Sequence, residues 1–333
     1  MSRRCSRPFA LMAVMSLVGA CGLLGDQPPA SAPTIGELET GRITVAVLPT
    51  VEIAPLMLAI EEGWFADAGL DVQVEIAGSG PATIAGMIGG DYDIAYSSYV
   101  PFIAAQAKQA ADLRIVTDNS YAAPNTAMLV TAPHSGFTSV QQLERRRIAV
   151  PGLNTTADLL VKSAMAVSNL DHTTVQWVPL PFPDMAAALE RGDIDAAMLV
   201  EPFITTAEMV IGAVPLLDLS FGPTSELPFT GYGATAEFVR DHPNTTMVFQ
   251  QVMRRAAEAA HDDRARVVKL LPKIVTVDHS TARLVILPGF RSTLDAKRIQ
   301  RVADLMLTFG VLDAPFDVAP MLLPRPVAVP SSR

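Results

Sequence analysis

Short apolar runs alternate with stretches of helical period over most of the chain, and turn residues separate them. The runs rich in β-branched residues predict strands at 41–49 and 72–76 and a third that begins at 91. Between them, the spacing of apolar residues predicts helices over 55–62 and 81–90. The second of these helices has a proline in its first turn and two glycines at its end. This alternation predicts an α/β fold with a largely parallel sheet.

The same order of strands and helices recurs about 100 residues later. Residues 147–151 match 45–49 in residue type at an offset of 102, and residues 185–197 match 83–95 at the same offset. Two separate matches at one offset indicate a duplicated lobe, and the repeat is too long for a solenoid. The later part of the chain is mostly helical in pattern, over 236–240, 246–261, 265–271, 281–285 and 294–309.

The N-terminal segment has the parts of an export signal. Three arginines precede an apolar run over 9–20, which at 12 residues is too short to span a bilayer. The run ends in Leu-Val-Gly-Ala and Cys21, which resembles the lipobox of bacterial lipoproteins. The resemblance implies a signal peptide over 1–20 and a lipidated tether over 21–40 that anchors the protein to the outer face of the cell membrane. The alternative is an ordinary secretory signal with an incidental cysteine.

Loss of the signal changes the charge and the cysteine count. The whole chain carries a formal charge of -9, and residues 1–20 hold three arginines and no acidic residue, so the mature chain carries -12. We do not expect so acidic a chain to bind nucleic acid. Cys5 leaves with the signal and Cys21 is lipidated, so no thiol remains for a disulfide, a metal or a nucleophile. We expect neither a metal nor a cofactor.

Several motifs resemble those of one family of transport proteins. They are the run AIEEGWFADAGLDV at 59–72, the pair GSGPA at 78–82 and GDYDIA at 90–95, and LERGDIDAA at 189–197 with Glu-Pro-Phe at 201–203. Together they resemble the substrate-binding lipoproteins of ABC importers, in the nitrate/sulfonate/taurine and thiamine-precursor-like group. The resemblance covers about residues 40–310 and does not specify the ligand.

The resemblance implies the α/β, two-lobed type II periplasmic-binding-protein fold, with mostly parallel sheets flanked by helices and two crossovers. The lobes are expected to close around one small molecule by a hinge motion. The family also implies docking on a membrane permease with its ATPase, and we expect the binding protein to be a monomer. The expected segments are lobe 1 over 41–126 and 230–312, lobe 2 over 127–222, crossovers near 122–126 and 221–230, and a C-terminal tail over 313–333.

The candidate ligand-binding residues follow predicted strands. Ligands of open α/β sheets bind beyond the carboxyl ends of the strands, and residues just before a helix can offer hydroxyl and free N–H groups there. Each capping residue has the alternative role of a plain helix cap, each aromatic residue that of core packing, and Glu201 that of tying the crossover loop. The candidates are Thr50, Ser79, Gly80, Ser97, Ser98, Tyr121, Asn154, Thr155, Phe182 and Glu201.

The charges near these strand ends bear on the ligand. Acidic residues lie there and basic residues do not, whereas a buried anion normally needs an arginine or several N–H donors. We therefore expect a neutral or amine-bearing organic ligand, such as a pyrimidine-like heterocycle. A sulfonate, taurine or nitrate stays the alternative, since helix N-termini alone can hold an anion. The acidic residues are Glu52, Asp118, Asp184 and Glu201.

Enzymatic function finds little support in the sequence. No two of the five histidines stand four residues apart, and the nucleophile-elbow and phosphate-loop motifs are absent. Residues 78–83 fail the dinucleotide fingerprint at its third glycine. We expect a binding protein and not an enzyme. The alternatives are an enzyme of the same fold that makes a cofactor precursor, and a lipoprotein that binds a partner protein; the export signal argues against a transcription regulator.

Overall fold

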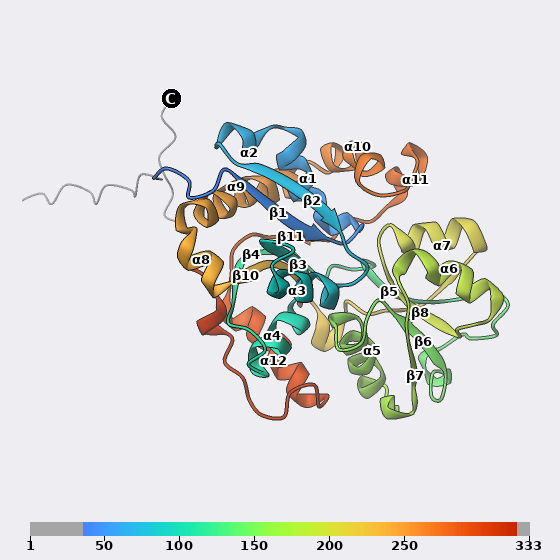
Figure 1. The fold of residues 1–333 in the computed structure, drawn as a ribbon. Coiled ribbons are helices and arrows are strands. Elements are labelled where there is room, and N and C mark those ends of the chain that lie inside the picture. The colour runs from blue at the N-terminus through green and yellow to red at the C-terminus, as the bar shows by residue number, and fades with distance from the viewer. Residues whose placement is uncertain (1–35, 325–333) are drawn as a thin grey trace, which may run out of the picture. The chain divides into compact units, whose positions relative to one another are not determined.

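Two β-sheets organise residues 36–324, the part of the chain that this computed structural model describes (Figure 1). These residues fall within one unit of the chain, Ile35–Ala328. The first sheet has the strand order β11-β4-β10-β3-β1-β2. Its strands are β1 (Arg42–Val47), β2 (Asp71–Ile76), β3 (Ile94–Ser98), β4 (Leu113–Tyr121), β10 (Pro228–Thr235) and β11 (Gly289–Phe290).

The second sheet has the order β7-β6-β8-β5-β9. In both sheets the strands of the βαβ units run parallel, as β1 does with β2 and β3, whereas β10 runs antiparallel between β3 and β4, and β5 runs antiparallel between β8 and β9. The sheets are therefore mixed: most strands of each sheet run in one direction, as predicted, and β5, β10 and β11 run opposite to them. The strands of the second sheet are β5 (Ala127–Thr131), β6 (Arg147–Val150), β7 (Gln176–Pro179), β8 (Ala196–Val200) and β9 (Val214–Asp218).

Helices cover both faces of the first sheet and flank the second (Figure 1). We call each sheet with its helices a lobe. The second lobe holds α5 (Thr156–Val167), α6 (Phe182–Arg191) and α7 (Phe203–Ile211). The helices of the first lobe are the 3₁₀ helix η1 (Val51–Ile53) and the α-helices α1 (Ala54–Glu61), α2 (Trp64–Asp67), α3 (Gly80–Gly89), α4 (Tyr99–Ala107), α8 (Ala236–Asp241), α9 (Pro243–Asp262), α10 (Arg264–Ile274), α11 (His279–Leu284) and α12 (Ala296–Thr308).

Two buried cores stabilise this arrangement. One joins β1 to α1, α2, α9 and α10 on one face of the first sheet. The other begins under α3, α4 and α12 on the opposite face and continues into the second lobe. The chain passes between the sheets twice, between Tyr121 and Ala127 and between Asp218 and Pro228. The predicted two-lobed α/β fold with two crossovers is confirmed.

The predicted repeat is visible in matching hydrogen bonds. In the first lobe Asp93 accepts a hydrogen bond from the Thr44 amide at 2.7 Å, and in the second lobe Asp195 accepts one from the Arg147 amide at 2.8 Å. Asp93 and Asp195 are 102 residues apart, as the sequence predicts, but Thr44 and Arg147 are 103 apart. The first strand is therefore offset by one residue more than expected. Both aspartates hold strand starts, which is a structural role.

Candidate functional site

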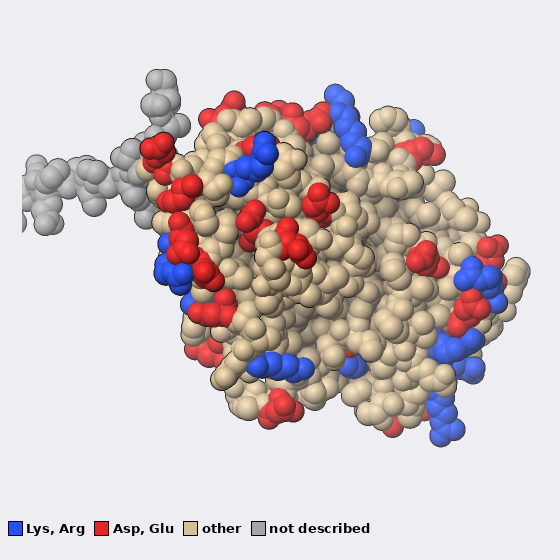
Figure 2. Space-filling model, in the orientation of Figure 1, with Lys and Arg blue, Asp and Glu red and all other residues tan. Residues whose placement is uncertain are grey.

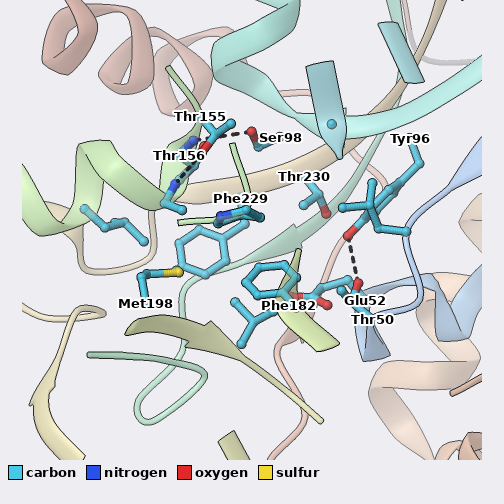
Figure 3. Close-up of a pocket in the computed structure, with 16 residues that line it drawn as sticks. Thr50, Glu52, Tyr96, Ser98, Thr155, Thr156, Phe182, Met198, Phe229 and Thr230 are labelled. Atoms are coloured by element: carbon cyan, nitrogen blue, oxygen red, sulfur yellow. Dashed lines mark hydrogen bonds between the residues drawn. The ribbon is translucent and has the colours of Figure 1, made fainter. Parts of the chain in front are cut away.

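A cleft lies where the carboxyl ends of β1, β3 and β8 face the first turns of α3 and α5 (Figure 3). Its empty volume, including the part open to solvent, is about 540 Å³. Residues of both lobes line it. The apolar lining residues are Leu48, Pro151, Ala157, Leu160, Phe182, Met198, Val200 and Phe229, and the others are Thr50, Glu52, Gly80, Tyr96, Ser98, Thr155, Thr156 and Thr230.

Aromatic side chains form the apolar middle of the cleft. Phe182, in the first turn of α6, stacks on Phe203 of α7 with ring centroids 5.4 Å apart. Phe229 of β10 and Met198 of β8 are also part of the lining (Figure 3). These surfaces can cover the flat faces of a ring or an aliphatic chain, because burial of apolar area stabilises such contacts.

Hydroxyl groups and helix N-termini form one end of the cleft. Thr155 caps α5 and makes a capping box with Asp158. The next residue, Thr156, donates its amide to Ser98 Oγ of the first lobe at 3.3 Å (Figure 3). The Thr156 side chain is 4% exposed, and its hydroxyl oxygen has no hydrogen-bond partner in the described part of the chain. This end can therefore donate to, or accept from, a polar group of a ligand.

A buried carboxylate forms another part of the cleft wall. Glu52 lies in η1 and is 3% exposed, and its Oε2 has no hydrogen-bond partner among the described residues. Its backbone oxygen accepts a hydrogen bond from Asn119 Nδ2 at 2.9 Å, which fixes the turn. Burial raises the pKa of Glu52 to about 7, and the nearby charge of Glu201 adds to the effect. Near neutral pH this group can therefore gain or lose a proton.

No lysine or arginine is among the described residues that line the cleft. On the face shown in Figure 2, the charged side chains lie mainly away from the band between the two lobes. The cleft has a weakly polar wall with one acidic group, which attracts a cation or a hydrogen-bond donor and opposes an anion.

Half of the candidate residues lie in the cleft, and the structure adds others. The lining includes the predicted Thr50, Gly80, Ser98, Thr155 and Phe182. Thr50 Oγ1 lies 3.3 Å from the hydroxyl of Tyr96, which also lines the cleft. The signal for Glu52 was its place just beyond the first strand. The lining residues that were not among the candidates are Leu48, Glu52, Tyr96, Pro151, Thr156, Ala157, Leu160, Met198, Val200, Phe229 and Thr230.

Three other candidates lie close to the cleft but are not part of its lining. Ser79 caps α3 through the Ala82 amide at 3.3 Å. Ser97 is fully buried, and its hydroxyl has no partner among the described residues. Asn154 is exposed and has a φ of +54°, a conformation that asparagine tolerates better than most residues.

The last two candidates also lie outside the cleft lining. Tyr121, at the end of β4, has the guanidinium groups of Arg291 and Arg298 at 4.8 and 5.4 Å from its ring centroid. Glu201 is buried and accepts hydrogen bonds from the Thr205 amide and hydroxyl and from the Ile286 amide. Glu201 ties its loop in this structure, which is the second of the two roles considered for it.

The remaining acidic residues near strand ends are Asp118, which serves the fold, and Asp184. Asp118 is buried, accepts a hydrogen bond from the Tyr99 hydroxyl at 2.5 Å and pairs with Arg298 at 3.4 Å. Burial raises its pKa to about 7, against the opposing effects of Tyr99 and Arg298. Asp184 is exposed in the first turn of α6. Neither lines the cleft.

Residues 36–324 hold neither a metal-binding cluster nor a membrane-spanning helix. Within that range no group of three histidine, cysteine, aspartate or glutamate residues is placed to hold a metal ion. No helix in the same range combines the length and apolar character needed to cross a bilayer. The predicted signal peptide, the lipidation site Cys21 and most of the tether lie outside the described residues.

Comparison with known proteins agrees with this fold. A protein of Bacillus subtilis (strain 168) named as binding aliphatic sulfonates is 26% identical over 322 residues, covering 93% of this chain and 92% of its own. The alkanesulfonate-binding protein of Xanthomonas axonopodis pv. citri, solved with MOPS bound, superposes with a TM-score of 0.73 at 18% identity, over 85% of this chain and 98% of that one.

A ligand-binding component of an ABC-type import system from Staphylococcus aureus, solved with zinc bound, superposes with a TM-score of 0.76 at 13% identity, over 86% of this chain and 99% of its own. At these identities the solved structures establish the fold. The model of the NMT1-like family matches residues 36–271, which is more than half of the chain. The resemblance seen in the sequence motifs is thereby confirmed: the chain belongs to the NMT1-like family.

Proposed function

We propose that this chain is the solute-binding protein of an ABC importer, and that it takes up a neutral or amine-bearing small organic molecule in the cleft between its lobes. The fold, the cleft lined by both lobes and the names of the relatives support a binding role. The proposal includes a permease with its ATPase as partner, a monomeric binding protein, and anchoring outside the cell membrane through Cys21. Phe182 and Phe229 of the cleft lining offer aromatic faces to a flat nitrogen heterocycle of the pyrimidine type.

The buried carboxylate of Glu52 is the observation that favours a neutral or amine-bearing ligand over an anion. An ionised carboxylate in an apolar cleft needs a partner, and Oε2 has none among the described residues. An ammonium, amidine or ring N–H group of a ligand would supply that partner. A sulfonate or nitrate placed near Glu52 would instead meet a like charge with no lysine or arginine in the lining to compensate.

A sulfonate, taurine or nitrate is the second candidate. The names of two relatives favour a sulfonate, as do the helix N-termini at Gly80 and Thr156, where amide groups can hold an anion. Taurine would satisfy both ends of the cleft, with its amine at Glu52. An enzyme of the same fold is less well supported, because the titratable groups in the described lining are Glu52 and Tyr96 and no nucleophile is paired with a base there.

Thermal unfolding with a ligand panel tests the ligand class. The panel holds alkylamines, pyrimidines, taurine, alkanesulfonates and nitrate. We expect stabilisation by an amine or a heterocycle, about 2.7 kcal/mol at a concentration 100 times Kd, and its loss in Glu52→Gln. The matched control is Glu75→Gln, an exposed residue outside the cleft lining. Stabilisation by a simple alkanesulfonate that Glu52→Gln leaves intact or strengthens, with no response to nitrogen compounds, would contradict the proposed ligand class.

Lipid attachment is tested separately by metabolic labelling with a palmitate analogue in a bacterial host. We expect the label on the wild-type chain and none on Cys21→Ser, while Cys5→Ser matures normally. Labelling of the Cys21→Ser chain, or release of the unlabelled wild-type protein into the soluble extracytoplasmic fraction, would support an ordinary secretory signal instead.

A further inference from the structure

Glu201 joins the two lobes at a point close to Glu52. It follows β8 of the second sheet, and its backbone oxygen accepts a hydrogen bond from the Val51 amide of the first lobe at 3.2 Å. Its carboxylate oxygen Oε1 accepts a second bond across the lobes, from the Ile286 amide at 3.1 Å. One residue of the second lobe therefore holds two segments of the first lobe that are more than 200 residues apart in the chain.

Both of these segments belong to the first lobe by their packing. Val51 is buried in the core that contains β1 and α1, and Val285, next to Ile286, is fully buried in the same core. The Glu201 side chain is itself 2% exposed and is held on its own lobe by the Thr205 amide at 3.1 Å and the Thr205 hydroxyl at 2.9 Å. The carboxylate is therefore in a fixed position when it meets the Ile286 amide.

The contact at Val51 bears directly on the cleft. Val51 and Glu52 are neighbours in η1, so a bond to the Val51 amide restrains the turn that carries the Glu52 carboxylate. Asn119 holds the same turn from within the first lobe, through the Glu52 backbone oxygen. The Asn119 bond lies within the first lobe, whereas both bonds to Glu201 cross from one lobe to the other.

We propose that Glu201 is a positioning residue, which clamps η1 and the segment around Ile286 when the lobes come together and so sets the Glu52 carboxylate in the cleft. This inference rests on the proposed function, in which Glu52 meets the ligand. The acidic part of the ligand site is then complete only in the closed arrangement. Binding of a ligand to Glu52 therefore depends on the bonds made by Glu201. Opening of the lobes breaks these bonds and releases the ligand.

Amide hydrogen exchange of the ligand-free chain, followed by NMR, tests the clamp. In Glu201→Ala the carboxylate is lost, but the backbone oxygen that binds the Val51 amide remains. If the carboxylate clamps the lobes, exchange at Val51 rises at least tenfold although its own acceptor is intact, and exchange at Ile286 rises with it. If the carboxylate only caps α7, exchange rises at Thr205 while Val51 stays as in the wild type, and the proposal is overturned.

Two control variants and one partial rescue separate the loss of the contact across the lobes from changes within the second lobe. Thr205→Ala removes a bond within the second lobe, and Glu208→Gln changes an exposed acid on the same helix; neither is expected to alter exchange at Val51. Glu201→Gln keeps an oxygen for the Ile286 amide and is expected to give a smaller rise than Glu201→Ala. Should Glu201→Ala fail to fold, equal exchange at Val51 in Glu201→Gln and Thr205→Ala would overturn the proposal.

A carbon-13 titration of the Glu52 carboxyl supplies a readout that a general loss of stability does not mimic. Both Glu201→Ala and Glu201→Gln lose the charge that raises the pKa of Glu52, but Glu201→Gln keeps an oxygen for the Ile286 amide. We therefore expect the pKa of Glu52 to fall further in Glu201→Ala than in Glu201→Gln, and to stay raised in Glu208→Gln and Thr205→Ala. Equal falls in Glu201→Ala and Glu201→Gln would refute the coupling. Neither measurement uses a ligand, so an unproductive ligand screen and a failed clamp are separate results.

Discussion

At the scale of single residues, the raised pKa of Glu52 makes stability depend on pH. The folded chain keeps a proton on this carboxyl up to about pH 7, whereas the unfolded chain loses it near the ordinary glutamate pKa of 4.5. Between these values the folded state binds more protons, so its stability falls as the pH rises and levels off above pH 7. In Glu52→Gln this fall is absent. We therefore expect the free energy of unfolding of the variant, relative to that of the wild type, to increase by about 3 kcal/mol between pH 4 and pH 8. Urea unfolding at pH 4, 6 and 8 measures the difference.

The comparison isolates Glu52 because Asp118, whose pKa is also raised to about 7 by burial, is present in both proteins. Glu75→Gln, an exposed substitution, should give a difference that does not change over the same range. A constant difference between Glu52→Gln and wild type from pH 4 to pH 8 would show that Glu52 has an ordinary pKa in the folded chain.

Ligands of open α/β sheets bind beyond the carboxyl ends of the strands, and this rule explains which site residues could be predicted from the sequence. It placed Thr50, Ser98 and Thr155 at the cleft because each follows a strand and precedes a helix. It could not separate Ser97 from Ser98, although neighbouring residues of a strand point to opposite faces and only one faces the cleft. Nor could it distinguish Glu52 from Glu201, because the partner that satisfies Glu201 is 85 residues away in the chain.

At the scale of elements, β10 shows why the sequence did not reveal the antiparallel strands of the mixed sheets. The βαβ pattern reveals parallel strands, whereas β5, β9 and β10 follow or precede the crossovers and carry no such pattern. β10 has the sequence PFTGYGAT, whose two glycines are unfavourable in a strand interior. At Gly233 the structure gives the reason: a Cβ there would lie 2.9 Å from Phe102 Cζ and 3.1 Å from the backbone oxygen of Arg114.

Gly233→Ala is therefore expected to destabilise the chain by about 2 kcal/mol, because the backbone of β4 and the ring of Phe102 must shift. Urea unfolding measures the loss. The matched control is Gly78→Ala, where a Cβ would meet no atom within 4 Å. If both substitutions change the unfolding free energy equally, close packing is not the reason for the glycine in β10.

At the scale of the whole molecule, α12 holds the second crossover. Arg301 donates to the backbone oxygens of Pro223 and Ser225 at 2.9 and 2.8 Å, and Arg298 donates to that of Glu226 at 3.2 Å. Because a hinge motion needs these residues to move, Arg301→Ala should loosen the crossover. We expect amide exchange over residues 219–227 to rise about tenfold, as the loss of a charged hydrogen bond implies. Hydrogen exchange with mass spectrometry measures it.

Lys297→Ala, an exposed change on the same helix, serves as the control for Arg301→Ala. It should leave exchange over 219–227 as in the wild type. Equal exchange in the two variants would mean that the crossover is held by its own turns and not by α12.

The hydrogen bond from the Thr156 amide to Ser98 Oγ has a consequence for selectivity. The Ser98 hydroxyl occupies the donor that an oxyanion would otherwise use, so a sulfonate must compete with the protein for it. Such an exchange of one acceptor for another brings little net gain in free energy. A ligand without an oxygen at that end leaves the bond in place and keeps one of the links between the lobes. Under the proposed function, a ligand that forms no hydrogen bond with the Thr156 amide therefore binds without breaking this link.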